Sequence, residues 1–465
     1  MNFNKRLFLL LLLAFSCAGC KQETAEQHAS NGDAFFDNGE YKAAVDEYTV
    51  AIELDPTCHE AYYGRASAWT ALDDFDKAIA NCNEAIRLAP EDAEAYFTRG
   101  FVWLHKCEYD KAIADYTEAI TLNPEYAEAY DNRGVAWNEL GDYDKAFADY
   151  DEAIRLNPEL ADAYINRGQA WNELSEYDKA VADFDKALTL APDHAIALYN
   201  RGLARHSQGK LELALDDYSE AIRLNPEFVS AYNNRGVVWR DLGFPGEAFA
   251  DFTITIGLNP EHVGAHVNRG RIWLLVGEYD KAVVDFTEAV RLNPEHNDVY
   301  NCRGFAWDKL GEYDKAIADY NEAIRLNPEN CDAYQSRGAT WHDLGEYDKA
   351  MADYNAAVRI NPQHIEAFQS RGVIYNIIGE YDQAVISFTE AIKIDPESTF
   401  SYCGRGISWN YLGEYDKALA DFNETLRLDP NNAYAYRDRA VAWEALGEKE
   451  KAAADREEYE RLISQ

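Results

Sequence analysis

The sequence predicts an all-α solenoid of about thirteen helical hairpins, each 34 residues long. The first observation is a fixed period: twelve of the thirteen prolines fall 34 residues apart along the 465-residue chain, from Pro56 to Pro430. The second is that each period holds two stretches with apolar residues at helical spacing. The third is that glycine and alanine recur at fixed places in the period. Such self-similarity indicates stacked repeats rather than separate globular domains.

Each repeat is predicted to begin three residues after its boundary proline. In the fourth repeat, the first helix is predicted over 127–140 (AEAYDNRGVAWNEL) and the second over 142–156 (DYDKAFADYDEAIRL). Gly141 lies between them, where it can end the first helix with a positive φ. Proline ends the second helix, because it cannot continue a helix interior. The predicted array covers 25–465, with repeats starting at residues 25, 59, 93, 127, 161, 195, 229, 263, 297, 331, 365, 399 and 433.

Small and large residues at fixed positions predict how the two helices pack. The eighth position is Gly in eleven repeats and Ala in two, Ala66 and Ala440, and the twentieth position is Ala throughout. We expect two helix backbones to approach closely at these positions. All ten tryptophans stand at the eleventh position, in phase with these packing points. We therefore interpret them as core residues and not as an exposed platform for sugars.

The repeat resembles a known family. The spacing of Tyr130, Arg133, Gly134, Trp137, Gly141, Tyr143, Ala146, Tyr150, Ala153 and Pro158 is similar to that of the tetratricopeptide repeat. This resemblance implies a right-handed superhelical solenoid whose concave groove is lined by the first helix of each repeat. It also implies that the groove holds another protein or a peptide. The groove positions carried over from the family include Tyr63, Phe97, Phe101, Leu104, His105, Asn138, Asn172, Asn376, Ile407 and Tyr411.

An arginine stands at the seventh position of every repeat but the first, where the family usually has Leu. Ten repeats also carry Asp at the twenty-third position, on the second helix. We predict structural ion pairs between the two positions, such as Arg133 with Asp149 and Arg337 with Asp353, and Asp319 belongs to the same acidic series. The alternative is a ladder of arginines that lines the groove and binds a polyanion.

The chain is strongly acidic, with 83 Asp and Glu against 44 Lys and Arg and a formal net charge of −39. This charge opposes binding to nucleic acid and to anionic lipid surfaces. The apolar groove positions beside acidic ones suit a protein or peptide partner with apolar and basic character. An apolar patch packed within the superhelix is the alternative interpretation.

The first residues have the composition of an export signal. Lys5 and Arg6 precede an apolar run over 7–15, which is short for a membrane span. The stretch Cys17-Ala18-Gly19-Cys20 resembles a bacterial lipoprotein cleavage box, which implies a signal peptide at 1–19, a lipidated Cys20 and a short tether at 20–24. Lys21 is not the Asp that retains some lipoproteins in the inner membrane, so outer-membrane attachment is expected. Ordinary signal cleavage and a retained anchor are the alternatives.

These observations predict a non-catalytic interaction scaffold in a bacterial cell envelope. The alternative is a receptor for a small ligand or glycan enclosed by the superhelix. No catalytic constellation stands apart from the repeat grid, and no cofactor is expected. His262 and His266 lie four residues apart but lack a third ligand, so no metal site is predicted. Departures from the pattern in repeats six to eight indicate a hinge, a docking notch or neutral drift.

Overall fold

The computed structural model describes residues 24–464, and within this range it contains 26 helices and no strand. The predicted all-α array of thirteen hairpins is confirmed. The first helices of the repeats are α2 (Ala25–Asp37), α4 (His59–Ala71), α6 (Ala93–His105), α8 (Ala127–Glu139), α10 (Ala161–Glu173), α12 (Ala195–Ser207), α14 (Val229–Asp241), α16 (Val263–Leu275), α18 (Asn297–Lys309), α20 (Cys331–Asp343), α22 (Ile365–Ile378), α24 (Thr399–Leu412) and α26 (Ala433–Ala445).

The second helices follow after short turns. They are α3 (Tyr41–Leu54), α5 (Phe75–Leu88), α7 (Tyr109–Leu122), α9 (Tyr143–Leu156), α11 (Tyr177–Leu190), α13 (Leu211–Leu224), α15 (Pro245–Leu258), α17 (Tyr279–Leu292), α19 (Tyr313–Leu326), α21 (Tyr347–Ile360), α23 (Tyr381–Ile394), α25 (Tyr415–Leu428) and α27 (Lys449–Ile463). Cys20, the predicted signal peptide and most of the predicted tether lie outside the described residues.

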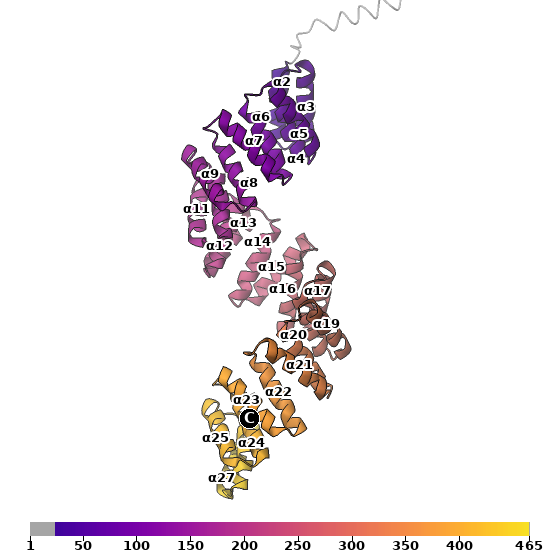
Figure 1. The fold of residues 1–465 in the computed structure, drawn as a ribbon, viewed down its shortest axis with the longest axis vertical. Coiled ribbons are helices and arrows are strands. Elements are labelled where there is room, and N and C mark those ends of the chain that lie inside the picture. Colours follow the sequence, from indigo (N-terminus) through magenta and orange to yellow (C-terminus); the bar gives the residue numbers. More distant parts are fainter. Residues whose placement is uncertain (1–23, 465) are drawn as a thin grey trace, which may run out of the picture. The chain divides into compact units, whose positions relative to one another are not determined.

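The chain divides into two compact parts, Met1–Ala231 and Tyr232–Gln465, and the division falls within α14 of the seventh repeat. Within each part, the two helices of a hairpin pack together and the hairpin stacks against the next one, as α8 packs on α9 and α23 packs on α24 (Figure 1). First helices of consecutive repeats also contact each other, as α8 contacts α10 and α22 contacts α24. The core is therefore a series of small clusters, each shared between neighbouring repeats.

The turn inside each hairpin requires a left-handed residue. Gly141 has φ +77°, and nine more glycines at the same position have similar positive values. Asp73, Cys107 and Ser175 replace glycine at this position in three repeats and keep φ near +60°. A side chain is strained in this conformation, whereas glycine is not. The turn geometry is thus imposed by the packing of the hairpin, even where the local residue disfavours it.

The eighth-position glycine makes room for an aromatic ring. A Cβ added at Gly134 would lie 2.7 Å from Cε1 of Tyr150, and the Ala146 carbonyl oxygen would be 3.2 Å away. In all eleven repeats with glycine at the eighth position, an added Cβ would meet the ring of the Tyr or Phe at the twenty-fourth position. The two backbones approach closely at Gly134 and Ala146, as expected, but the nearest neighbour of the glycine is the Tyr150 ring.

The two exceptions follow the same rule. Ala66 replaces glycine in the second repeat, and the twenty-fourth residue there is Cys82 rather than an aromatic residue. Ala440 replaces it in the last repeat, where the twenty-fourth residue is Arg456. Both alanines are buried. A methyl group is accommodated only where no ring lies opposite it.

The tryptophans are only half buried, which corrects their interpretation as core residues. All ten have intermediate exposure. Trp137 packs one side of its ring against the core clusters, and the Lys145 ammonium lies 4.0 Å from the centre of the ring. Nine repeats contain this lysine–tryptophan pair, eight residues apart. A stacked cation thus covers the indole in those repeats.

Candidate functional site

The recurrent arginine joins three helices. Arg133 on α8 donates from Nε and Nη2 to both carboxylate oxygens of Asp149 on α9, each at 2.8 Å. Its Nη1 donates to Thr117 Oγ1 on α7 of the preceding repeat, at 3.1 Å. Its guanidinium carbon also lies 5.5 Å from the centre of the Tyr130 ring. We call this arrangement the arginine bridge, because one fork ties a hairpin together and ties it to its predecessor.

The bridge recurs along the array with small changes of partner. Ten arginines bond bidentately to the Asp sixteen residues later, including Arg303 to Asp319 and Arg337 to Asp353. Arg65 and Arg371 meet Asn81 and Ser387 instead. Burial without a carboxylate partner lowers the pKa of both guanidinium groups. The forks point into the protein, which favours the structural ion pair over a polyanion ladder.

An apolar cleft of about 750 Å³ lies in repeats eleven to thirteen. Its lining is mostly aliphatic and aromatic: Val373, Ile377, Tyr381, Phe400, Ile407, Tyr411 and Tyr434. Tyr411 stacks on Tyr381 with ring centres 4.5 Å apart, yet 65% of its surface is exposed. Phe400 and Tyr434 are 55% and 61% exposed. We call this the C-terminal cleft, and it brings the predicted groove residues Asn376, Ile407 and Tyr411 together.

The polar groups of the C-terminal cleft bond mostly to one another. Arg437 donates to both oxygens of Asp438 at 2.9 and 3.0 Å and lies over the Tyr434 ring. Burial raises the pKa of the Cys403 thiol to about 12, so this thiol stays protonated near neutral pH. The cleft therefore offers apolar surface and a neutralised ion pair, and it carries no free net charge.

Asn376 has a structural role that the sequence did not reveal. Its amide donates to the Gly404 carbonyl of the next repeat at 3.3 Å, and its side-chain oxygen accepts from Ser408 at 2.8 Å. Asn172 likewise donates to the Asn200 carbonyl at 3.2 Å. Both NH₂ groups thus join consecutive repeats.

A second cleft of about 530 Å³ lies in the first three repeats. Phe36, Thr70, Phe97, Phe101 and His105 line it, with Glu94 at its edge. The Phe101 and His105 rings contact edge to face, 4.4 Å apart. We call this the N-terminal cleft. It gathers three predicted groove residues, Phe97, Phe101 and His105.

Two other predicted residues of this region do not line the N-terminal cleft. Leu104 packs beside Ile113 and Tyr116 in the core, and it is half buried. The Tyr63 ring packs edge to face on His59, and burial raises the pKa of its hydroxyl. Leu104 thus packs against a cluster shared by repeats three and four, and Tyr63 contacts a residue of its own helix.

Two buried acceptor groups lie on α8, the first helix of repeat four: the Asp131 carboxylate and the side-chain oxygen of Asn138. Asp131 is only 5% exposed and accepts two hydrogen bonds from the Asn166 amide, at 3.0 and 3.1 Å. Burial raises its pKa from 3.8 to about 7, and the nearby Asp162 and Glu128 carboxylates contribute. Asn138 donates to Glu173 at 3.1 Å, but its side-chain oxygen is buried and has no partner among residues 24–464.

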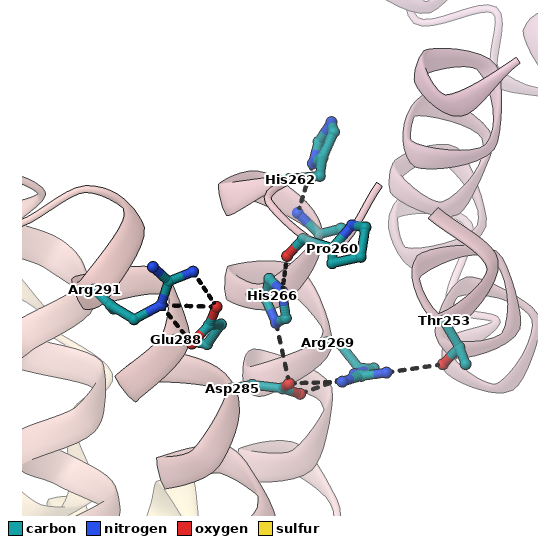
Figure 2. A network of polar contacts seen from close by, with 9 residues as sticks. Thr253, Pro260, His262, His266, Arg269, Asp285, Glu288 and Arg291 are labelled. Carbon is teal, nitrogen blue, oxygen red and sulfur yellow. Dashed lines mark hydrogen bonds and ion pairs between the residues drawn. The ribbon is translucent and has the colours of Figure 1, made fainter. Parts of the chain in front are cut away.

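The two neighbouring histidines act as structural residues (Figure 2). His262 Nδ1 accepts from the Ala265 amide at 3.0 Å and caps α16. His266 is buried, with Nε2 2.9 Å from the Pro260 carbonyl oxygen and Nδ1 3.4 Å from Asp285. Asp285 in turn pairs with Arg269. Each ring is thus engaged by the protein.

One cluster of possible metal ligands has no signature in the sequence. Ligand atoms of Cys331, Asp332 and His364 lie within 4.8 Å of one another. His364 Nδ1, however, accepts the Ala367 amide at 3.3 Å and caps α22. The other nitrogen of a neutral ring then carries the proton, and it lies 3.2 Å from Asp332. This nitrogen has no lone pair to offer a metal. The role of His364 is therefore to cap the N-terminus of α22.

None of the helices within residues 24–464 is both long and apolar enough to cross a membrane.

Family comparisons agree with the repeat geometry. Models described as "Tetratricopeptide repeat" match residues 30–93, 93–126, 161–194, 263–296, 298–330, 331–364, 365–398 and 400–432, and one described as "TPR repeat" matches 136–174 and 202–243. Together they cover more than half of the chain. The chain belongs to the tetratricopeptide repeat family, whose helical arrays serve as scaffolds for protein interaction.

Individual relatives match the chain over very different lengths. "Hsp70-Hsp90 organizing protein 3" of Arabidopsis thaliana is 35% identical over 57 residues, which is 12% of this chain and 10% of that protein. The chain thus matches about a tenth of that relative's length. The structure titled "Crystal structure of APC/C hetero-tetramer Cut9-Hcn1" is 15% identical, with 88% of this chain and 95% of that chain covered and a TM-score of 0.48. "YrrB: a TPR protein with an unusual peptide-binding site" is 26% identical, with 40% and 95% covered and a TM-score of 0.36.

Proposed function

We propose that the protein is a non-catalytic scaffold that binds an apolar segment of a partner protein in the C-terminal cleft. The observation that carries this proposal is the exposure of Phe400, Tyr411 and Tyr434 around one concavity. Soluble proteins rarely leave several large apolar side chains exposed together unless a partner covers them. Large aromatic anchors in a pocket also supply most of the binding energy in protein interfaces.

The repeat pattern supports the same assignment. Residues shared by the repeats, such as Gly406, Ala418 and Arg405, are used for packing and for the arginine bridge. Ile407 and Tyr411 instead occupy positions whose residue type differs from repeat to repeat. Shared residues maintain a scaffold, and the differing ones are available for recognition. The short match to Hsp70-Hsp90 organizing proteins supports a protein-binding role and favours no particular partner.

A small apolar molecule is the second candidate ligand. A volume of about 750 Å³ lies within the usual range for small-molecule sites. The aliphatic and aromatic lining favours an apolar ligand over a glycan, because a glycan needs many polar partners.

Photocrosslinking in native cells tests both candidates. A photoreactive amino acid at Tyr411 is expected to form an adduct with one protein partner, and Ile407→Lys is expected to abolish the adduct. The same photoreactive residue at Asp343, the corresponding position of the tenth repeat, is the labelling control. Leu140→Lys, which changes a 45% exposed residue outside the cleft, is the substitution control. An apolar small molecule released from the purified protein, without a protein adduct, would favour the second candidate.

We further propose that a lipid on Cys20 anchors the scaffold in a bacterial cell envelope, with the outer membrane as the favoured site. The support is the charged start, the short apolar run and the Cys-Ala-Gly-Cys box at 17–20. Incorporation of a labelled fatty acid that is lost in Cys20→Ala, but kept in Cys17→Ala, is the expected result. Equal labelling of the wild-type protein and Cys20→Ala would contradict the proposal.

A further inference from the structure

Four carboxylates lie on the first helices of repeats three to five: Glu94 on α6, Glu128 and Asp131 on α8, and Asp162 on α10. We call them the acidic row. Their carboxylates repel one another. Glu128 contributes to the raised pKa of both Glu94 and Asp131, and Asp162 contributes to the raised pKa of Asp131. Within residues 24–464, none of the four forms an ion pair with a lysine or arginine. Glu128 and Asp162 are exposed, so the row carries negative charge that no lysine or arginine among these residues neutralises, whereas Asp131 is buried and its pKa of about 7 leaves it partly protonated near neutral pH.

The neighbouring polar groups are also acceptors. The side-chain oxygens of Asn138 and Asn172 are shielded from solvent and receive no hydrogen bond from the described residues. Glu139 and Glu173 stand beside them on the same helices and are exposed. Buried acceptors normally have donors, and leaving one without a donor costs free energy. The two amide oxygens lie below the surface, whereas Glu139 and Glu173 add two exposed carboxylates beside the acidic row.

The acidic row begins at the N-terminal cleft. Glu94 lines that cleft, and the Tyr126 hydroxyl donates to Glu94 at 2.5 Å. The Tyr126 ring in turn packs on Phe97 of the cleft, with ring centres 4.8 Å apart. Phe101 of the same cleft is 37% exposed. Apolar surface and uncompensated carboxylates therefore meet at Glu94.

Only one class of partner satisfies both parts of this surface. Nucleic acids and anionic lipids would be repelled by the carboxylates. A neutral apolar segment would fill the cleft and leave the acidic row as it is. Lysine and arginine supply both positive charge and several N–H donors, and they bind carboxylates with charge-assisted hydrogen bonds.

We infer that repeats one to five form a second docking surface, which binds a peptide segment whose apolar anchor enters the N-terminal cleft while its basic residues lie along the acidic row. This surface differs in chemistry from the C-terminal cleft, where Arg437 already neutralises Asp438. The inference does not rest on the function proposed for that cleft, since the two surfaces share no residue.

The test uses the purified full-length chain and a fluorescent synthetic peptide in which Leu and Phe precede a run of Lys and Arg. Fluorescence anisotropy is expected to show binding that weakens at high salt, because exposed charges are screened. Replacing Leu and Phe by Ser, or the basic residues by Glu, is expected to weaken binding at least about tenfold.

Two variants locate the binding surface. The double variant Glu128→Lys/Asp162→Lys is expected to weaken binding about tenfold or more at low salt, and Phe101→Ser is expected to weaken it about fivefold. The matched control is Asp382→Lys/Asp416→Lys, which changes the net charge equally at exposed positions of the C-terminal part. It is expected to change the affinity less than twofold. Circular dichroism establishes that each variant keeps its helices.

An equal loss in the control double variant would show attraction by net charge alone and would overturn the inference. Unchanged affinity in Phe101→Ser would remove the apolar anchor and overturn it as well. Crosslinking at Tyr411 is expected to persist in the Glu128→Lys/Asp162→Lys variant, which separates failure of this inference from failure of the proposed function.

Discussion

The Tyr150 ring lies so close to Gly134 that a Cβ at that position would be 2.7 Å from Cε1. This contact sets the separation of α8 and α9, because the ring is buried and cannot move outward. The second repeat shows the opposite combination. There Ala66 replaces the glycine, and Cys82, at the twenty-fourth position, is small enough to leave room for the methyl group.

Gly134→Ala is expected to destabilise the fourth repeat by about 1–2 kcal/mol. The added methyl group overpacks the ring, which outweighs the gain of roughly 0.5–1 kcal/mol that alanine brings to a helix interior. Hydrogen exchange of the α8 and α9 amides measures the effect locally, which suits an array whose repeats open separately.

The double variant Gly134→Ala/Tyr150→Cys is the control for this experiment, because it copies the Ala66 and Cys82 combination of the second repeat. Tyr150→Cys alone leaves a cavity, and the alanine is expected to be neutral or stabilising in that background. A double-mutant cycle should therefore give a coupling of about 1–2 kcal/mol. If the free-energy changes of the two substitutions simply add, the Tyr150 ring is not the reason that residue 134 is glycine.

Breaking the arginine bridge is expected to cost about 3 kcal/mol in Asp149→Ala, because it leaves the largely buried Arg133 fork without its carboxylate. The reciprocal exchange Arg133→Asp/Asp149→Arg should recover part of this loss. Full recovery is not expected, since Thr117 no longer receives a hydrogen bond from Arg133. Hydrogen exchange in α7, α8 and α9 measures both variants, and an exchange variant no better than either single substitution would refute the pairing.

Asp131→Asn is expected to stabilise the protein at pH 8 and to have little effect near pH 4. The folded pKa of about 7 lies above the ordinary 3.8, so the folded state binds the proton more tightly. The contribution of Asp131 to stability is therefore greatest at low pH and falls as pH rises through about 4 to 7. Asparagine removes this penalty, on the order of 2–4 kcal/mol at pH 8.

Denaturant unfolding of both proteins across this pH range measures the difference. Asp416→Asn, which changes an exposed carboxylate, is the control and should leave the pH profile unchanged. A difference between Asp131→Asn and wild type that stays constant with pH would contradict the buried, raised carboxyl group.

Ser175→Gly is expected to stabilise the fifth repeat by roughly 0.5–1 kcal/mol, because Ser175 holds φ +61° without the freedom of glycine. Gly141→Ser should cost a similar amount in the fourth repeat, where φ is +77°. Local hydrogen exchange in the two hairpins compares them. Destabilisation by Ser175→Gly would mean that the serine side chain contributes a contact that outweighs its strain.

The helices could be predicted from the sequence because one period repeats along the chain and the boundary prolines fix its phase. The pairing of Arg133 with Asp149 was predictable for the same reason, since both residues recur sixteen apart. Thr117 could not be predicted as the third member, because its place beside Arg133 depends on how one hairpin stacks on the next.

The binding surfaces were less predictable. Asn376, Ile407 and Tyr411 line the C-terminal cleft, and the amides of Asn172 and Asn376 also bond to backbone carbonyls of the following repeats. The sequence shows that these side chains are asparagines. It does not show how far one helix is shifted along the next, and this shift decides which backbone carbonyl each amide can reach. The coupling between Gly134 and Tyr150 was present in the sequence, because the exceptions Ala66 and Ala440 both lack an aromatic residue at the matching position.

The arginine bridge also makes the array tolerant of changes in length by whole periods. Arg167 contacts Asp151 sixteen residues before it and Asp183 sixteen residues after it. Excision of residues 127–160 would bring Thr117 to the place of Asp151, and Thr117 already serves as the acceptor for Arg133. Loss of this 34-residue module thus preserves the arginine bridge at the new junction, so a gene of this kind can shrink by recombination of whole modules.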